Sequence, residues 1–480
     1  MTTIDTALLP DVPPSIMHAA AALRSGELTS VQLVEACLAR ADVLDPILGV
    51  FIQRLDETAL AAAAIADDEL AAGIDRGPLH GIPLGIKDII ATKESTTTAQ
   101  SLILDPAWGS TGDAVVVSRL RAAGAIVIGK TSTMEFAIGM PDPSKPFPVP
   151  RNPWDTTRWT GGSSSGTGAG VAAGLFMGGL GTDTGGSVRI PAAFCGISGL
   201  KQTFGLVPKS GCVPLGFSLD HIGPMAPSAA DCLAMIAVMA GPDPSDPNCI
   251  DLRDPVWPDT LATSLVGLTI GVDRVNHLTV DGVEPAAVAA FEAALRVLAA
   301  AGAEVIEVEI PHYELMRAAG TVTSRGEASS YHRTDLSQRW SEYGVHTSKA
   351  TSMGTLVSGA DYVQAQRVRA FCNAALAEMM APLDAIVTPM AGIGAPLLEG
   401  LDHRSFMEWP VFSQFWNPTG LPALAIPMGR TPDGLPLSMQ IAGKAQAEAT
   451  VLTVAHAYQA ATDWHLAKPA FDASLLVARS

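Results

Sequence analysis

One stretch of the chain, "GGSSSGTGAGVAAGLFMGGLG" (161–181), carries a glycine at every fourth position from Gly166 to Gly178. In a helix this spacing places Gly166, Gly170, Gly174 and Gly178 on one face. Each glycine inside a helix costs roughly 1 kcal/mol relative to alanine, so such a stripe is expected only where another segment packs directly against the backbone. The stretch therefore predicts a helix with very close neighbours.

Helical and strand-like patterns alternate on both sides of this stretch. Thr29 and Gln32 have the spacing of a capping box, and Asp113 and Gly124 are expected to begin and end another helix. Helices are predicted over 29–45, 114–124, 284–301 and 448–461, and strands over 79–88, 125–130, 267–273, 303–310, 383–390, 421–429 and 435–443. This alternation is typical of the α/β class.

Two proline-rich stretches interrupt the alternation. Residues 140–153 are expected to form a loop, and residues 241–255 are the best candidate for a linker. Residues 311–380 have a helical pattern of their own. Because no internal repeat appears, one α/β unit over 1–480 is a simpler prediction than three domains.

Composition restricts the classes of protein. The net charge is −18, with 48% hydrophobic and 16% charged residues, so the chain is expected to be globular and not to bind nucleic acid. No basic and apolar leader begins the chain, and no run of about 18 apolar residues follows, so we expect a cytoplasmic protein without membrane contact.

Neither the cysteines nor the histidines have the spacing of a metal site. The six cysteines are scattered without a C-x-x-C pair, and the ten histidines are isolated. Free thiols, no metal and no cofactor are therefore expected.

Several short patterns match known catalytic motifs without their structural context. "GSSSG" (162–166) fits a nucleophile elbow centred on Ser164, but no buried strand precedes it. "SGLK" (198–201) fits S-x-x-K, and "GAGVAA" (168–173) fits a dinucleotide-binding pattern, again with no strand in front. All three are weak indications of function.

The stretch "GTDTGGSVRIP" (181–191) places Ser187 after two glycines. A serine hydroxyl is a poor nucleophile until a base removes its proton. The residues around Ser187 include no histidine, although a triad can assemble from distant parts of a chain. From the residues alone, the base therefore remains open.

Six segments in order resemble the amidase signature family of serine hydrolases: "LHGIPLGIKD", "GAIVIGKTSTMEFAIG", "RNPWD", "GGSSSGTGAGVAAG", "GTDTGGSVRIPAAFCGISGLK" and "SLDHIGPMA". Two C-terminal segments, "GLPALAIPMG" and "DGLPLSMQIAGK", resemble the family more loosely. The resemblance implies a central mixed, twisted β-sheet covered by helices on both faces, with the signature core at about 75–230. Residues 311–380 have no recognisable counterpart and are expected to be a variable helical insertion.

The resemblance also implies a catalytic triad made of Ser187 as nucleophile, Ser163 as bridging serine and Lys87 as base, with a cis peptide bond between Gly162 and Ser163. Lys87 can act as a base only if burial lowers its pKa towards neutrality. The neighbouring Asp88 would oppose this, but successive residues of a strand point to opposite faces.

The same resemblance assigns an oxyanion hole to the backbone N–H groups of Thr184, Gly185, Gly186 and Ser187. Such donors stabilise the charge that develops on the carbonyl oxygen. Asp183 and Arg189 are expected to hold the loop. The family commonly has glycine where this chain has Ser165, and this difference leaves the triad intact.

Three functions are compatible with this resemblance. The main prediction is a monomeric or homodimeric amidohydrolase that cleaves small amides, aryl acylamides or carbamates (urethanes). The alternatives are a glutamine-hydrolysing subunit of an aminoacyl-tRNA amidotransferase and a non-catalytic binding protein. The apolar stretch 137–153 favours a hydrophobic pocket, and by family analogy its lining is Phe136, Ile138, Gly139, Gln414, Phe415 and Trp416.

Overall fold

The structure is a computed structural model that describes residues 9–252, 257–402, 406 and 408–471. The main strands are β1 (Phe51–Arg54), β2 (Pro83–Lys87), β3 (Ile126–Thr131), β6 (Gly178–Asp183), β7 (Ser198–Lys201), β8 (His221–Ala226), β9 (Thr269–Val272), β10 (Glu304–Glu307), β11 (Ala385–Pro389), β12 (Ala423–Arg430) and β13 (Pro436–Gly443). Two further strands, β4 (Arg151–Asn152) and β5 (Asp155–Trp159), form a separate hairpin.

The α-helices are α1 (Ile16–Ser25), α2 (Ser30–Leu48), α3 (Asp56–Ala71), α4 (Val115–Ala122), α5 (Ser165–Ala173), α6 (Arg189–Cys195), α7 (Ala229–Met239), α8 (Val275–Leu278), α9 (Pro285–Ala300), α10 (Tyr313–Gln338), α11 (Val345–Ser352), α12 (Gly359–Met380), α14 (Trp416–Thr419) and α15 (Glu448–Ala460). Short 3₁₀ turns are η2 (Glu135–Ala137), η3 (Trp340–Glu342), η4 (Met353–Leu356) and η5 (Trp464–Leu466).

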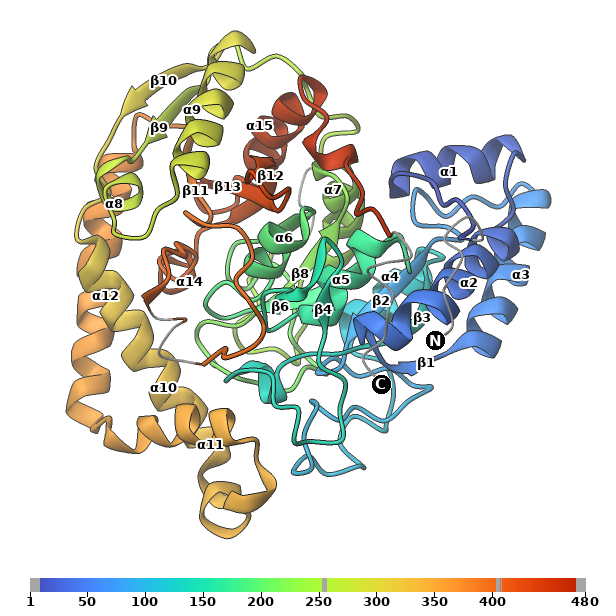
Figure 1. The fold of residues 1–480 in the computed structure, drawn as a ribbon, viewed down its shortest axis with the longest axis horizontal. Coiled ribbons are helices and arrows are strands. Elements are labelled where there is room, and N and C mark those ends of the chain that lie inside the picture. The colour runs from blue at the N-terminus through green and yellow to red at the C-terminus, as the bar shows by residue number, and fades with distance from the viewer. Residues whose placement is uncertain (1–8, 253–256, 403–405, 407, 472–480) are drawn as a thin grey trace.

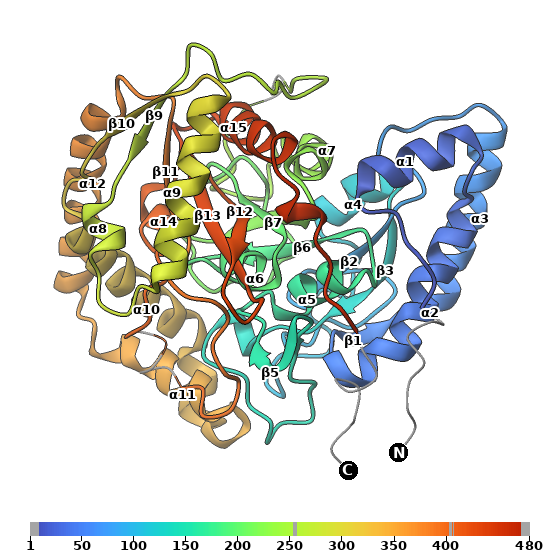
Figure 2. The same ribbon diagram turned by 45° about the horizontal axis from the view of Figure 1, so that its top comes forward.

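Within the described residues, one mixed sheet of 11 strands runs through the molecule in the order β1-β3-β2-β6-β8-β7-β12-β13-β11-β9-β10 (Figure 1). β2 pairs in parallel with both β3 and β6, whereas β6 and β8 are antiparallel. Helices flank the sheet; Figure 2 shows α9 and α15 over β12 and β13. The predicted mixed α/β sheet with helical layers is confirmed.

Most predicted elements form close to their predicted positions. The capping box of α2 is present, with the Gln32 N–H donating to Thr29 Oγ1 at 3.1 Å and the Thr29 N–H donating to Gln32 Oε1 at 2.9 Å. The expected cap of α4 is wrong. Asp113 instead accepts a hydrogen bond from the Lys93 N–H and pairs with Arg121, because those partners lie within its reach.

The glycine stripe is shorter than its spacing predicts. α5 ends at Ala173, Gly174 takes a left-handed conformation after it, and Gly178 begins β6. The close packing is nevertheless present, since a Cβ on Gly170 would collide with the Phe176 ring. The chain turns back after Gly174 so that Phe176 packs on its own helix.

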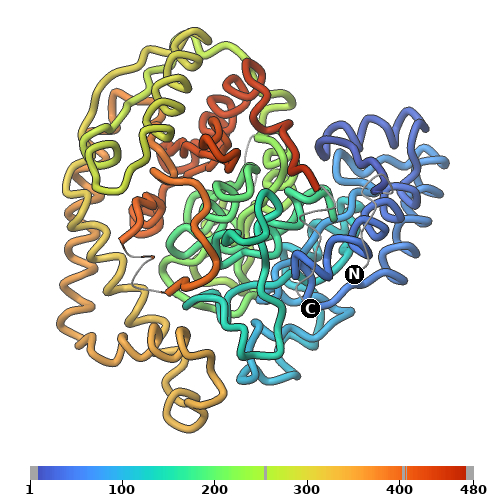
Figure 3. Tube along the Cα trace, in the orientation of Figure 1, coloured from blue at the N-terminus to red at the C-terminus, as the bar shows by residue number. Residues whose placement is uncertain are grey.

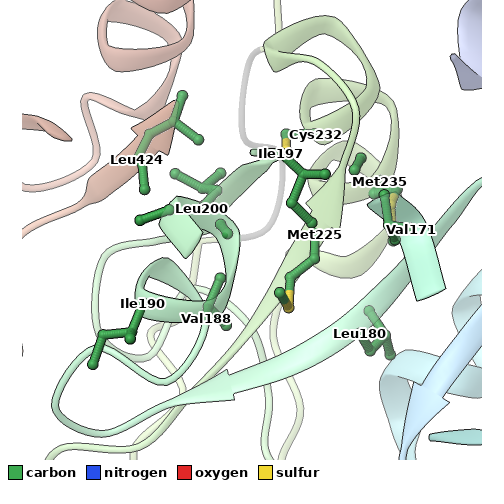
Figure 4. Packing of buried hydrophobic residues seen from close by; sticks show 14 of the residues in the cluster. Val171, Leu180, Val188, Ile190, Ile197, Leu200, Met225, Cys232, Met235 and Leu424 are labelled. Atoms are coloured by element: carbon green, nitrogen blue, oxygen red, sulfur yellow. The ribbon is translucent and has the colours of Figure 1, made fainter. Parts of the chain in front are cut away.

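The centre of the molecule is an apolar core in which side chains from both halves of the chain meet. Figure 4 shows buried residues of α5, α7 and β12 around the central strands. These include Val171, Leu180, Val188, Ile190, Ile197, Leu200, Met225, Cys232, Met235 and Leu424. The strands that precede the predicted linker and those that follow it therefore share one apolar core.

The segment 311–380 is helical, as its pattern predicts, and its status as a variable insertion stays a prediction. α10 and α12 lie side by side at one end of the molecule, and α11 connects to them beyond η3 (Figure 1). At the opposite end, the first and last described segments run together (Figure 3), where the Lys468 ammonium donates to the Val12 carbonyl at 3.3 Å.

Candidate active site

Strand register brings Lys87 to the centre of the candidate site. Lys87 is the last residue of β2, and Ile86 is paired with Leu180 of the parallel strand β6. The carboxyl ends of neighbouring parallel strands meet at one edge of a sheet, so Lys87 lies beside Thr182. The Lys87 ammonium donates hydrogen bonds of 2.7 Å to the Thr182 hydroxyl and of 2.7 Å to the Ser163 hydroxyl.

Ser163 lies immediately before the N-terminus of α5. Its peptide bond to Gly162 is cis, as the resemblance implies. The Ser163 carbonyl accepts hydrogen bonds from the Thr133 hydroxyl at 2.9 Å and from the Met134 N–H at 3.2 Å. These bonds hold the Ser163 hydroxyl against Lys87.

Burial gives Lys87 the properties of a base. The side chain is fully buried, and the loss of hydration lowers the Lys87 pKa to about 7. The neighbouring Asp88 is turned away, since its carboxylate pairs with Lys130 at 2.9 Å and accepts hydrogen bonds from Thr98. The expected separation of Lys87 from Asp88 is present in the structure.

Ser187 lies on the glycine turn that follows β6. Ser187 and Ser163 line the same cavity, and the Ser164 N–H donates to the Ser187 carbonyl at 3.2 Å. Among the described residues, the two hydroxyls are not hydrogen-bonded to each other. The proposed relay requires a hydrogen bond between them, and such bonds often form only when substrate binds.

The turn presents backbone N–H groups to the cavity. Among the described residues, the amides of Thr184, Gly185 and Ser187 have no hydrogen-bond acceptor, whereas the Gly186 N–H donates to Asp183 Oδ1 at 2.7 Å. Gly186 has a φ of +125°, and a Cβ there would collide with Ser413. The amides of Thr184, Gly185 and Ser187 are therefore free to donate, whereas that of Gly186 is engaged, and the oxyanion hole as a whole stays a prediction.

A buried ion pair holds the turn from behind. Arg189 Nε and Nη2 donate to the two carboxylate oxygens of Asp183, each at 3.0 Å, and neither side chain is exposed. Burial would raise the pKa of Asp183, but the Arg189 guanidinium and the Asn417 amide hold it well below its usual range. Asp183 stays charged and anchors the Gly186 amide.

A cavity of about 140 Å³ opens in front of Ser187. Its wall is partly apolar, as expected, and comes from the segment after β3, from the turn and from α10. The lining residues include Met134, Ala137, Ile138, Gly139, Met140, Trp159, Ser163, Gly185, Ser187, Ile190, Leu219, Gln414 and Pro418. Of the predicted lining, Ile138, Gly139 and Gln414 border this cavity, and their role in binding substrate stays a prediction.

The structure places three residues of the predicted lining, Phe136, Phe415 and Trp416, behind the cavity wall and not on it. The Phe136 ring is buried behind the wall and packs edge-on against His332, with 4.4 Å between ring centroids. Phe415 is fully buried and stacks on Tyr313 at 4.9 Å, and Trp416 packs against it. These rings support the wall because their segments turn the side chains into the core.

α10 also forms part of the cavity wall, which the sequence does not predict. Arg317, Thr321, Ser324 and Arg325 line the cavity from one face of this helix. Their spacing of three and four residues is helical, so a polar stripe is visible in the sequence. No local pattern, however, tells which surface that stripe faces.

The described residues include no group of three or more histidine, cysteine, aspartate or glutamate side chains that could hold a metal ion. None of the described helices is both long and apolar enough to cross a membrane.

The mixed sheet, the Lys87–Ser163 pair and the serine on a glycine turn together define a hydrolase of the serine type. The chain belongs to the amidase family, because the family model described as "Amidase" matches residues 32–452. Amidohydrolase chemistry is thereby supported for this chain, and the resemblance seen in the sequence is confirmed.

Comparisons with individual proteins reach over nearly the whole chain. The chain is 38% identical to one subunit of the glutamyl-tRNA(Gln) amidotransferase of Chloroflexus aggregans, covering 95% of this chain and 98% of that protein. A structure described as a vestigial protein complex that reveals the origins of an s-triazine catabolic enzyme superposes with a TM-score of 0.85 at 31% identity, over 95% and 100% of the two chains. The peptide amidase of Stenotrophomonas maltophilia superposes with a TM-score of 0.80 at 30% identity, over 95% of this chain and 98% of that chain.

These comparisons correct the expectation about partners. The sequence predicts a monomer or homodimer that acts on a small molecule. That expectation is wrong, because relatives that match over nearly their full length are named as one subunit of an amidotransferase. Composition could not reveal this, since surface charge does not report on the assembly of subunits.

Proposed function

We propose that this chain is the amide-cleaving subunit of a cytoplasmic amidotransferase and that it releases ammonia from the side chain of glutamine. The observation that carries the proposal is the buried Lys87–Ser163 hydrogen bond beside Ser187, in a chain 38% identical to an amidotransferase subunit. The assigned roles of the three residues are part of the proposal.

In this mechanism, Ser187 Oγ attacks the carbonyl carbon of the amide while its proton passes to Ser163, whose own proton passes to neutral Lys87. The N–H groups of Gly185 and Ser187 stabilise the oxyanion, and removal of one such donor typically costs about 10²–10³ in rate. Lys87 returns the proton through Ser163 to the leaving nitrogen. Ammonia departs, and water then hydrolyses the acyl-enzyme at Ser187.

A second candidate function is the hydrolysis of other amides, including aryl acylamides and carbamates. The apolar side of the cavity, with Met134, Ile138 and Met140, favours this candidate because it suits an apolar acyl or aryl group. The similarity to a peptide amidase points in the same direction.

A panel assay separates the two candidates. The purified chain, alone and with any subunits that co-purify, is given glutamine, a fatty amide, a nitroanilide and an aryl carbamate. We expect ammonia release from glutamine, and we expect Ser187→Ala to lower it by at least about 10³-fold with the fold retained. The matched variant Ser165→Ala removes a buried hydroxyl whose hydrogen bond to the Ser163 carbonyl is 3.5 Å long, and it should keep its activity.

Two outcomes would count against the proposal. Turnover of the nitroanilide or the carbamate without turnover of glutamine would favour the second candidate. Activity that survives in Ser187→Ala would remove the nucleophile assignment.

A further inference from the structure

His221 is a buried histidine beside the glycine turn that carries Ser187. It is the first residue of β8, where the antiparallel register pairs it with Asp183, the last residue of β6. Its side chain is buried and packs edge-on against the Phe204 ring, with 5.5 Å between the ring centroids. An apolar ring would fill this space as well, so what a histidine adds at this position is its ring N–H.

The hydrogen bonds around the His221 ring fix the position of its proton. Nδ1 lies 2.7 Å from the Leu219 carbonyl oxygen and 3.2 Å from the Asp183 carbonyl oxygen. Because carbonyl oxygens only accept, Nδ1 carries the proton and donates to both. Nε2 is then an acceptor, and the amino group of buried Lys201 lies 3.4 Å from it as the donor. Burial and Lys201 hold the His221 pKa well below its usual value, so the ring stays neutral.

Two side-chain donors hold the Asp183 carbonyl. The Asn417 amide donates to it at 3.0 Å, in addition to the His221 N–H. The peptide bond between Asp183 and Thr184 is trans. In a trans peptide, the carbonyl of one residue and the N–H of the next point in opposite directions. The Thr184 N–H therefore points away from His221 and Asn417.

Thr184 lies between two cavities. It borders the cavity in front of Ser187 and a second cavity of about 240 Å³, which His221 lines and which lies on the side of the Asp183 carbonyl. The Thr184 N–H is thus on the side of the Ser187 cavity, and it has no acceptor among the described residues. The loop after Leu219 carries Asp220, which accepts from the Thr184 hydroxyl at 2.5 Å. His221 therefore holds the backbone of Thr184 directly and its side chain through this loop.

We propose that His221 is a positioning residue for amide cleavage at Ser187, and that it acts through the Asp183 carbonyl to aim the Thr184 N–H at the oxyanion of the reacting amide. A donor that is already oriented stabilises the developing charge without the cost of reorganisation during the reaction. The inference rests on the proposed cleavage at Ser187 but not on glutamine as the substrate.

Two substitutions separate the N–H from the bulk of the His221 ring. His221→Asn keeps a donor, because the asparagine amide nitrogen takes the place of Nδ1, whereas His221→Leu has nearly the same shape as asparagine and no donor. We expect His221→Leu to lower kcat by about tenfold with little change in KM, since Asn417 still holds the carbonyl. We expect kcat of His221→Asn to stay within about threefold of the wild-type value.

His277→Leu is the matched control. His277 is also fully buried, and its Nδ1 lies 3.1 Å from a backbone carbonyl oxygen, that of Asp273. It borders neither of the two cavities. This variant therefore loses a comparable buried hydrogen bond, and it should keep the wild-type kcat.

A transition-state analogue distinguishes the aiming of the N–H from a general loss of structure. The Ser187 oxygen adds to the boron of phenylboronic acid and forms a tetrahedral adduct, in which one boronate oxygen takes the place of the oxyanion. We expect the Kd from calorimetric titration to rise by about tenfold in His221→Leu and to return towards the wild-type value in His221→Asn. Unfolded protein would lower the number of binding sites and leave Kd unchanged. If His221→Leu does not fold, His221→Gln replaces it, because the glutamine amide nitrogen overlies Nε2 and not Nδ1.

The outcomes separate this inference from the proposed function. The kinetic comparison uses whichever amide of the panel the wild type cleaves, so cleavage of another amide without glutamine contradicts the proposed function and still tests the inference. If none is cleaved, the Kd of phenylboronic acid decides: a rise in His221→Leu that His221→Asn reverses supports the inference. Unchanged kcat and Kd in His221→Leu overturn it, and so does an equal loss in His221→Leu and His221→Asn. A wild type that does not bind phenylboronic acid also overturns it, whereas glutamine cleavage by that protein would uphold the proposed function.

Discussion

Lys87 shows how one residue's chemistry depends on its immediate surroundings. A lysine is ordinarily protonated at neutral pH, but burial lowers the Lys87 pKa to about 7. The one carboxylate adjacent in sequence, Asp88, pairs with Lys130 instead. Family motifs identify Lys87 and Ser163 in the sequence, whereas the pairing of Asp88 becomes visible only when β3 brings Lys130 beside β2.

The pH dependence of activity should follow this lysine. Because the proposed mechanism uses neutral Lys87 as the base, it predicts that kcat/KM rises with pH through about 7 as the ammonium loses its proton. Thr182→Val removes a hydroxyl that accepts from the ammonium. The ammonium form of Lys87 then lacks one hydrogen-bond acceptor, which lowers the Lys87 pKa. The rise of kcat/KM with pH should therefore move to lower pH by about one unit. Measuring kcat/KM on both sides of neutrality checks this.

Thr97→Val is the control, because Thr97 accepts from Lys130 at 2.9 Å and not from Lys87. If kcat/KM rises at the same pH in Thr182→Val and in the wild type, the assignment of Lys87 as the base is contradicted.

At the scale of elements, the helical segment 311–380 is tied to the glycine turn that carries the proposed oxyanion donors. Glu327 of α10 accepts hydrogen bonds from the Ser218 N–H at 3.0 Å, the Ser218 hydroxyl at 2.7 Å and the Tyr362 hydroxyl at 2.7 Å. The loop that contains Ser218 also carries Asp220, which accepts from the Thr184 hydroxyl at 2.5 Å. Movement of α10 would therefore reach the turn through this loop.

Replacing Glu327 should impair catalysis without direct contact with substrate. Glu327→Ala leaves Ser218 without its acceptor, and we expect a loss of about 2 kcal/mol in the free energy of unfolding. We also expect kcat to fall by about tenfold with little change in KM, since the oxyanion turn is less well positioned. Tyr362→Phe is the milder control, because it removes one donor to Glu327 and leaves Ser218 held. Equal kinetics in Glu327→Ala and the wild type would show that the loop keeps its position unaided.

At the scale of the whole molecule, one sheet joins the two halves of the chain. β7, from the segment before the proline-rich stretch 241–255, pairs with β12 from the segment after it. That stretch is the best candidate for a linker in the sequence, and the single unit over 1–480 stays a prediction. A shared sheet and core argue that the halves depend on each other for stability.

Unfolding tests that dependence. Hydrogen exchange pulses at increasing urea concentration should show peptides from β6 and from β12 losing protection at the same midpoint, because their strands lie in one sheet. Peptides from exposed loops serve as the unprotected reference. Separate midpoints, with β12 opening before β6, would mean that the chain contains two independently folding units.

By itself, the sequence determined the α/β alternation, the positions of most strands and the family, and it led to the prediction of Lys87, Ser163 and Ser187 as the catalytic set. These are local patterns, in which neighbouring residues carry the information about backbone conformation or motif. Only the tertiary structure decided that Phe136 and Phe415 face the core, that Gly174 ends a helix, and that Arg317 and Arg325 line the cavity. Those facts depend on contacts between segments that are distant in the sequence, where the direction of a side chain is chosen by what packs against it.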